Sequence, residues 1–378
     1  MKLQITKDVL VNVLGKVDKA VGKSSIPVLQ GVYFEATADA LNFIGSNDEQ
    51  TISVTLPVDE TITVNEPGKI VFGKGILDIV KKLRSDVITI TTDELSFQYF
   101  IEAGLSKFNF SGYDAEEYPK FTEPSDEPIL EFAFEELKEY VDKLAFAAST
   151  EDSRPILQGI HIIGNEGTNQ LKLIATNSHI LSQKIVSKEV TEDISIVPKA
   201  KSLVDTLRVF NSSDTITVFS TATHLIFKSE EVTVRTRLLE GNYPATDRLV
   251  MTEFKAVLEI DKIELLNALE QVEIVGHSTS NNTPNAATIS VSGLNLKIEN
   301  NSTEMGKAEV EIPLVELQKN EEQDEEIKFA FNVKYLINVV KATDGNIQIG
   351  YVGSMRPISI LGTESNAEYK LILPIRTR

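Results

Sequence analysis

The chain has 378 residues, and its 56 acidic and 37 basic side chains give a net charge of −19. This length allows two or three domains, and the negative charge argues against a protein coated with phosphate-binding surface. The absence of cysteine excludes disulfide frameworks, thiolate zinc sites and cysteine nucleophiles. The sequence shows neither the apolar run of a signal peptide nor a membrane-spanning stretch, so we expect a cytoplasmic protein.

Short motifs show that the chain repeats itself. Residues 27–31 read PVLQG, and residues 155–159 read PILQG. Each motif is followed by a stretch of alternating apolar and polar residues, at 41–48 and at 171–178, and a fainter copy occupies 294–301. The alternation predicts a half-buried strand in each copy.

Two helices are predicted in each copy of the repeat. Apolar residues at helical spacing predict a first helix within 9–21, 137–144 and 263–272, the last with Ile263, Leu266, Leu269 and Val272 at that spacing. A second helix is predicted within 73–83, 200–210 and 333–343. This order of elements predicts an α+β chain of three similar domains, residues 1–123, 127–251 and 254–378.

Enzyme motifs are absent from the sequence. It contains no phosphate-binding loop, no dinucleotide-binding glycine motif, no zinc-protease motif and no nucleophile elbow. The acidic run at 321–326 is most simply a solvated turn, and residues 47–49 suit a loop between strands better than a metal site. We therefore expect no catalysis, cofactor or metal. The alternative is an enzyme built on triplicated domains, which would need a set of catalytic polar residues that the sequence does not show.

Basic residues recur on the three second helices. Residues 74–84 carry a net charge of +3, and residues 199–208 and 334–341 carry +2 each. Taken singly, each is most simply a solvated amphipathic helix. Their recurrence at equivalent positions favours a shared face that contacts phosphates without reading bases.

Longer motifs resemble one protein family. The segments SRPILQG (153–159), ATNSHILS (175–182), TRLLEGNYPATDRL (236–249), FNVKYLINVVKA (331–342) and LILPIRTR (371–378) resemble the DNA polymerase III beta subunits, the bacterial sliding clamps. The low-GC Gram-positive members are the most similar. The resemblance implies the DNA clamp fold: a head-to-tail homodimeric ring with helices lining the channel and sheets outside.

The resemblance also implies a non-catalytic function. Such a ring encircles double-stranded DNA without sequence specificity, tethers the replicative polymerase and confers processivity. The implied partners are DNA, a second copy of the chain, the DNA polymerase III alpha subunit and the clamp loader, with no membrane. Other polymerases, ligase and mismatch-repair proteins would bind through short linear motifs.

The same resemblance assigns residues to three surfaces. DNA contacts are expected from the basic residues Lys23, Lys81, Lys82, Arg84, Arg154, Lys201, Arg208, Lys334 and Lys341. A partner-peptide cleft between the middle and last domains is expected from Leu157, Thr176, His179, Leu181, Pro244, Arg248, Leu249, Asn332, Tyr335, Met355, Pro357, Leu371, Leu373, Pro374, Ile375 and Arg376. The dimer interface is expected from Lys107, Phe108, Phe110, Ile274 and Val275. Ordinary core burial is the alternative for each apolar residue taken singly.

Three departures from the family pattern qualify these expectations. Ile180 stands where the family usually has arginine, and Asn177 replaces a common aspartate, which alters the polar rim of the cleft. Residues 276–282 replace a segment that usually carries an arginine, which weakens the charge or the dimer contacts of the third domain. These features suggest, as an alternative, a clamp-fold paralogue that keeps the cleft but loads poorly on DNA.

Overall fold

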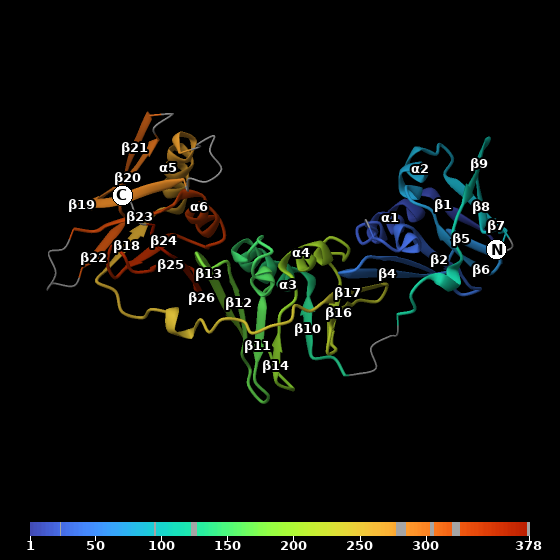
Figure 1. The fold of residues 1–378 in the computed structure, drawn as a ribbon, viewed down its shortest axis with the longest axis horizontal. Helices are drawn as coiled ribbons and strands as arrows, with labels where there is room; N and C mark the ends of the chain where they lie inside the picture. Colours follow the sequence, from blue (N-terminus) through green and yellow to red (C-terminus); the bar gives the residue numbers. More distant parts are fainter. Residues whose placement is uncertain are drawn as a thin grey trace. The chain divides into compact units, whose positions relative to one another are not determined.

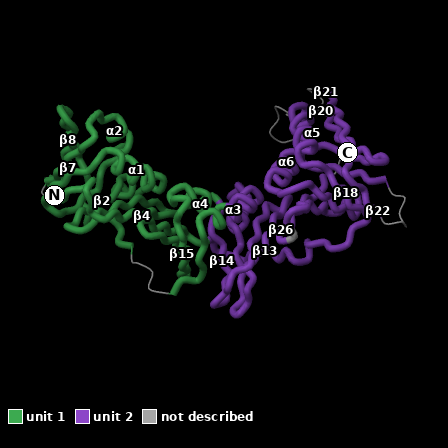
Figure 2. Tube along the Cα trace, turned by 180° about the vertical axis from the view of Figure 1, so that it is seen from behind, with its two compact units in different colours: residues 1–138, 201–238 green, residues 139–200, 239–378 purple. Residues whose placement is uncertain are grey.

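The structure is a computed structural model that describes residues 1–22, 24–93, 96–121, 127–276, 285–302, 306–319 and 326–375. The chain forms two compact units (Figure 2). Unit 1 comprises residues 1–138 and 201–238, and unit 2 comprises residues 139–200 and 239–378. The central third of the sequence therefore contributes residues to both units.

Unit 1 is built on two antiparallel sheets (Figure 1). The shorter sheet has the order β5-β1-β7-β8-β9, with strands Ile62–Glu66, Lys2–Thr6, Val87–Asp93, Gln98–Ala103 and Ser106–Ser111. The longer has the order β10-β15-β16-β17-β4-β3-β2-β6, with strands Leu130–Ala133, Thr215–Ser220, His224–Lys228, Val232–Arg237, Gln50–Pro57, Ala40–Ser46, Val32–Ala36 and Gly68–Phe72. Its middle joins β17 to β4, so distant parts of the sequence share one sheet.

Unit 2 repeats this plan (Figure 1). Its longer sheet has the order β14-β11-β12-β13-β26-β25-β24-β18-β22, with strands Ile194–Ile196, His161–Gly164, Leu171–Thr176, Ile180–Val186, Ser365–Ile372, Ile358–Gly362, Ile347–Tyr351, Ala256–Ile260 and Glu316–Lys319. The shorter has the order β21-β20-β19-β23, with strands Gly306–Pro313, Asn295–Ser302, Ala286–Ser292 and Lys328–Asn332. In this sheet the pairing of β13 with β26 joins parts of the chain that are far apart in the sequence.

The helices confirm the predicted repeat. The first helices are α1 (Lys7–Val17), α3 (Phe134–Leu144) and α5 (Lys262–Val275), and the second helices are α2 (Ile76–Lys82), α4 (Ala200–Leu207) and α6 (Val333–Lys341). Within each unit the helices lie on the same side of the longer sheet (Figure 2). Leu77, Leu203 and Leu336, equivalent in the three second helices, are all buried.

Two details of the predicted first helices are wrong. Helix α1 ends at Val17, so the predicted continuation to Val21 is a turn instead. In α5 the buried face is Leu265, Ala268, Leu269 and Val272, whereas Ile263 is 68% exposed. The helix has apolar residues on several sides, so spacing alone did not identify the face that packs on its sheet.

The three predicted strands form; burial alternates along β3 and β20, whereas β12 is buried at every residue except Lys172. Both glutamine-glycine motifs form a short 3-10 turn. The predicted stretches correspond to β3, β12 and β20, and the two 3-10 turns span Pro27–Gln30 and Pro155–Gln158. A tyrosine closes two of the repeats in the same way, because the hydroxyl of Tyr118 donates to Ile44 O at 3.2 Å and that of Tyr243 donates to Ile174 O at 3.4 Å. None of the helices in the described part of the chain is long and apolar enough to cross a membrane.

Candidate partner-binding, DNA-binding and dimer surfaces

The turn between β12 and β13 carries the first group of predicted cleft residues. The side-chain oxygen of Asn177 accepts hydrogen bonds from the backbone N–H groups of His179 and Ile180, both at 2.9 Å. Asn47 makes the same turn in the first repeat, where it accepts from the N–H groups of Glu49 and Gln50 at 2.8 Å. This side chain therefore fixes the turn that exposes His179.

The pairing of β13 with β26 brings together cleft residues that are far apart in the sequence. Leu181 lies opposite Leu371 in this pair, and both belong to a buried cluster with Ile174 and Tyr369. Leu157 and Thr176 are also buried. For the apolar residues Leu157, Leu181 and Leu371, core burial, the alternative raised for each of them, is what the structure shows.

Other predicted cleft residues are exposed and are available to a partner. Met355 is 55% exposed, Leu249 40% and Leu373 37%. Pro244 and Arg248 are exposed, and Pro357, Pro374 and Ile375 are partly exposed. Arg376 lies outside the described residues.

Tyr369 holds one of the exposed segments in place. Its hydroxyl lies 2.6 Å from Ser359 Oγ, donates to Leu249 O at 3.2 Å and accepts from the N–H of Met251 at 3.0 Å. The same hydroxyl therefore ties the chain around Leu249 to the strand pair β25–β26. The sequence analysis missed Tyr369, because an alternating strand pattern does not show which buried tyrosine has a long-range partner.

A hollow of about 720 Å³ opens in unit 2. Four predicted cleft residues line it: Leu157, His179, Asn332 and Tyr335. The rings of His179 and Tyr335 are stacked, with centroids 5.9 Å apart. The side chain of Asn332 accepts from the N–H of Tyr335 at 3.3 Å and so caps the start of α6. The sequence analysis missed Phe146 and Asn338, which also line this hollow.

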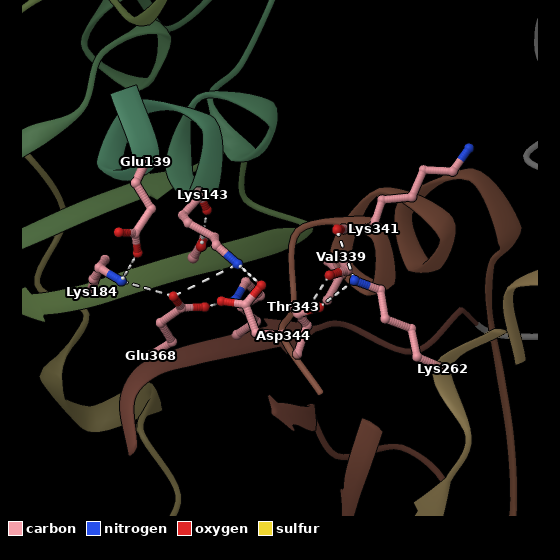
Figure 3. A network of polar contacts seen from close by, with 11 residues as sticks. Glu139, Lys143, Lys184, Lys262, Val339, Lys341, Thr343, Asp344 and Glu368 are labelled. Atoms are coloured by element: carbon pink, nitrogen blue, oxygen red, sulfur yellow. Dashed lines mark hydrogen bonds and ion pairs between the residues drawn. The ribbon is translucent and has the colours of Figure 1, made fainter. Parts of the chain in front are cut away.

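An ionic network connects several elements of unit 2 (Figure 3). Glu368 on β26 lies 2.9 Å from Lys184 and 2.5 Å from Lys370, and Lys184 also contacts Glu139 on α3 at 2.7 Å. Lys143, from the same helix, pairs with Asp344, which follows α6. The network therefore ties α3, β13, β26 and the end of α6 together.

The pKa values within this network follow from burial and pairing. Burial alone would raise the pKa of Glu368, but hydrogen bonds from Lys370 and Lys184 outweigh it and hold that pKa below its usual range. Burial lowers the pKa of Lys370, although Glu368 opposes the shift. Asp344 behaves like Glu368: burial opposes ionisation, and the hydrogen bond from Lys143 lowers its pKa.

The predicted DNA-contacting residues are exposed wherever the structure describes them. Lys81 and Lys82 end α2, with Arg84 just beyond, whereas Lys201 begins α4 and Arg208 follows it in the same unit. In unit 2, Lys334 and Lys341 lie at the two ends of α6. Arg154 and Lys334 also line the 720 Å³ hollow, beside His179. Lys23 lies outside the described residues.

Two of these cations have carboxylate partners. Arg208 lies 3.0 Å from Asp205, and Lys341 lies 2.9 Å from Glu270. Both cations are exposed to solvent, and an ion pair at the surface contributes little to stability and is easily exchanged for one with another anion. Among the described residues, no group of three or more His, Cys, Asp or Glu side chains is placed to hold a metal ion.

The predicted interface residues lie in two places: on the edge strand β9 of unit 1 and at the end of helix α5 in unit 2. Lys107, Phe108 and Phe110 belong to β9, the last strand of the shorter sheet of unit 1. The rings of Phe108 and Phe110 are stacked with centroids 5.9 Å apart, so both side chains lie on one face of the strand. In unit 2, Ile274 is 63% exposed and Val275 is half-buried at the end of α5.

Comparison with known proteins identifies the family. Three family models match in order: the N-terminal, central and C-terminal domains of the DNA polymerase III beta subunit, at residues 1–122, 131–245 and 247–376. The chain belongs to the DNA polymerase III beta subunit family.

Similar proteins cover the whole chain. The beta sliding clamp of Staphylococcus epidermidis is 28% identical over 388 residues, with 100% of each chain covered. Among solved structures, the sliding clamp of Bacillus subtilis is 29% identical with a TM-score of 0.93, and the beta chain of Streptococcus pneumoniae is 28% identical with a TM-score of 0.93. Both alignments cover 100% of each chain. The three-domain clamp fold and a DNA polymerase sliding clamp function follow.

The structure gives a physical account of two departures from the family pattern, at Asn177 and Ile180. Asn177 acts through an acceptor oxygen, which an aspartate would also supply. Ile180 is 1% exposed and lies opposite Ile372, so at this position an apolar core contact replaces a polar side chain. A side chain at Gly276 would meet Asn285, since an added Cβ would lie 1.7 Å from its Oδ1. Residues 277–282 lie outside the described part.

Proposed function

We propose that two copies of this chain close into a head-to-tail ring that encircles duplex DNA and slides along it. The observation that carries the proposal is the match of all three beta subunit domains, in order, along the chain. The domain boundaries that we propose are 1–123, 127–251 and 254–378.

Charge distribution supports the contact with DNA. Within a chain of net charge −19, exposed lysines and arginines recur at the ends of α2, α4 and α6. Phosphate contacts carry no sequence information, so cations of this kind hold DNA loosely and permit movement along it. The acidic remainder of the surface repels DNA.

Ring closure would use β9 of one subunit and the third domain of the other. An edge strand presents unpaired backbone groups, and β9 adds two stacked phenylalanines to that edge. Ile274, at the end of α5, would supply an apolar partner.

Partner proteins would bind the surface formed by His179, Leu249, Tyr335, Met355 and Leu373. Exposed aliphatic side chains and a methionine suit the Leu and Phe residues of a short linear motif. Expected partners are the DNA polymerase III alpha subunit, the clamp loader, other polymerases, ligase and mismatch-repair proteins. The clamp itself would be a non-catalytic protein of the cytoplasm.

A run-off experiment tests the topological mechanism. The protein is loaded by a clamp loader onto nicked circular DNA, and the circle is then cut once. We expect retention on the circle and loss from the linear product, and equal retention on both forms would contradict encirclement. Failure to load with a loader that loads a related beta subunit would favour the paralogue that keeps the cleft but loads poorly.

A further inference from the structure

A second hollow in unit 2, of about 850 Å³, carries mostly positive charge. Lys255, Lys328 and Arg356 line it, together with one carboxylate, that of Glu326. Lys328, Arg356 and Glu326 are exposed. We call this hollow the basic groove. A local excess of cations is notable in a chain of net charge −19.

The basic groove begins at residues of the proposed partner cleft. Met355 and Ile375, both assigned to that cleft, also line the groove. The N–H of Ile375 donates to Ala330 O at 2.8 Å, which holds the C-terminal segment along the edge of β23. A peptide with an apolar side chain on Met355 would therefore place neighbouring residues in the groove.

We propose that the basic groove binds acidic residues that flank the apolar motif of a partner protein. The inference rests on the proposed function and adds the chemistry of the flanking segment. Carboxylates in the groove would approach Lys328 and Arg356, whereas most of the chain's surface repels them. The groove would thus separate partners that share an apolar motif but differ in the charge beside it.

Fluorescence anisotropy with matched peptides tests this inference. Each labelled peptide contains Gln-Leu-Ser-Leu-Phe, with three Glu or three Gln residues added on its N-terminal or its C-terminal side. At low salt we expect one Glu-flanked peptide to bind about fivefold more tightly than its Gln-flanked match, since each exposed ion pair contributes modestly. Raising the salt concentration should remove the difference.

Variants connect the effect to the groove. In Lys328→Gln/Arg356→Gln we expect the Glu-flanked and Gln-flanked peptides to bind equally, with the Gln-flanked affinity within about twofold of wild type. The control is Lys2→Gln/Lys120→Gln, which removes two exposed lysines of unit 1 and should preserve the difference.

The outcomes separate this inference from the proposed function. Binding of the motif with equal affinities for Glu and Gln flanks overturns the acidic-flank inference alone. Failure of every peptide to bind contradicts the partner cleft and the inference that depends on it. If the double variant weakens a labelled oligothymidylate but leaves the Glu-flank advantage intact, the groove binds phosphates and the inference is overturned.

Discussion

Lys184 and Glu368 lie opposite each other in the pairing of β13 with β26, with 2.9 Å between Nζ and Oε1. The side chain of Glu368 is 3% exposed and that of Lys184 is 10% exposed. This ion pair therefore lies inside the strand pair that joins the second-domain and third-domain parts of unit 2. Leu181 and Leu371, both assigned to the proposed cleft, lie opposite each other in the same strand pair.

Removing the Glu368 charge should destabilise unit 2. Glu368→Gln leaves Lys370, whose side chain is 1% exposed, and Lys184 without their buried counter-charge. We expect the free energy of unfolding to fall by about 3 kcal/mol at pH 7, measured by urea denaturation. Glu364→Gln, an exposed change on the turn before β26, is the control. Equal stabilities of Glu368→Gln and the control would contradict a stabilising role for the pair.

The same pair predicts a pH dependence. In the folded protein the pKa of Glu368 lies below its usual value of 4.5. The ionised carboxylate therefore adds to the free energy of unfolding at pH values above 4.5, and this contribution is lost as the pH falls through the lower pKa of the folded state. The difference in unfolding free energy between wild type and Glu368→Gln should be constant near pH 7 and shrink below pH 4.5. A free-energy difference between wild type and Glu368→Gln that grows as the pH falls would contradict a lowered pKa of Glu368 in the folded protein.

Exposed cleft residues should contribute directly to peptide binding. Met355→Ala and Leu373→Ala remove side chains that are 55% and 37% exposed, and each should weaken binding of a Gln-Leu-Ser-Leu-Phe peptide by about 1–2 kcal/mol. Leu294→Ala, at a position that is 59% exposed outside the cleft, is the control. Isothermal titration calorimetry at one salt concentration gives the affinities. Unchanged affinity in both cleft variants would remove these residues from the site.

Leu181 is a poor probe of the same site. It is 1% exposed and packs with Ile174 and Leu371, so Leu181→Ala should cost about 2–5 kcal/mol of stability. Any loss of peptide binding in that variant would combine unfolding with the loss of a contact. The sequence motif did not distinguish buried residues such as Leu181 from exposed ones such as Met355 and Leu373.

The repeat made the fold predictable from the sequence, because each copy carries its own local pattern. Leu77, Leu203 and Leu336 are buried at equivalent places, and the predicted strands correspond to β3, β12 and β20. Helix α5 was placed correctly, but its buried face was not, since Ile263 continues the apolar spacing on the exposed side. Local periodicity identifies a helix or strand more reliably than it identifies the face by which that element packs.

Long-range pairing is the part that local patterns could not supply. Nothing in the alternation of 180–186 indicates β26 as its neighbour, yet that pairing places Lys184 beside Glu368 and Ile180 beside Ile372. The role of Asn177 was likewise hidden, because its importance lies in two backbone N–H groups rather than in the partner surface. The predicted cleft was assigned from resemblance to the family and not from residue spacing, and neither indicated Lys184 or Glu368.

The proposed dimer interface should be sensitive to a charge on β9. Phe108→Asp places a carboxylate at an edge position that is 37% exposed in the single chain and would be buried in a ring. We expect the variant to sediment as a monomer at concentrations where wild type is dimeric. Ile185→Asp, at a middle-domain position that is 38% exposed and outside the proposed interface, is the control. A Phe108→Asp protein that remains dimeric would exclude β9 from the interface.

The lysines at the end of α2 should contribute to the salt dependence of DNA binding. Lys81→Gln/Lys82→Gln should lower the slope of log affinity against log salt concentration by about 1–2, because each phosphate contact contributes about 0.9. The measurement uses a short linear duplex at low ionic strength, with Lys2→Gln/Lys120→Gln as the control. An identical slope in both double variants would show that the α2 lysines do not contact phosphates.

The Asn177 turn can be tested against its counterpart in the first repeat. Asn177→Ala removes the acceptor for the N–H groups of His179 and Ile180, and it should lower the unfolding free energy by about 1–2 kcal/mol. Asn177→Asp keeps an acceptor, and its free energy of unfolding should stay within about 0.5 kcal/mol of wild type.

Asn47→Ala removes the equivalent turn contact in unit 1, so it should lower the unfolding free energy by a similar amount without changing peptide affinity. Asn177→Ala, in contrast, should also weaken the peptide, because His179 stacks on Tyr335 in the proposed cleft. Equal peptide affinities in Asn47→Ala and Asn177→Ala would show that the turn supports folding alone.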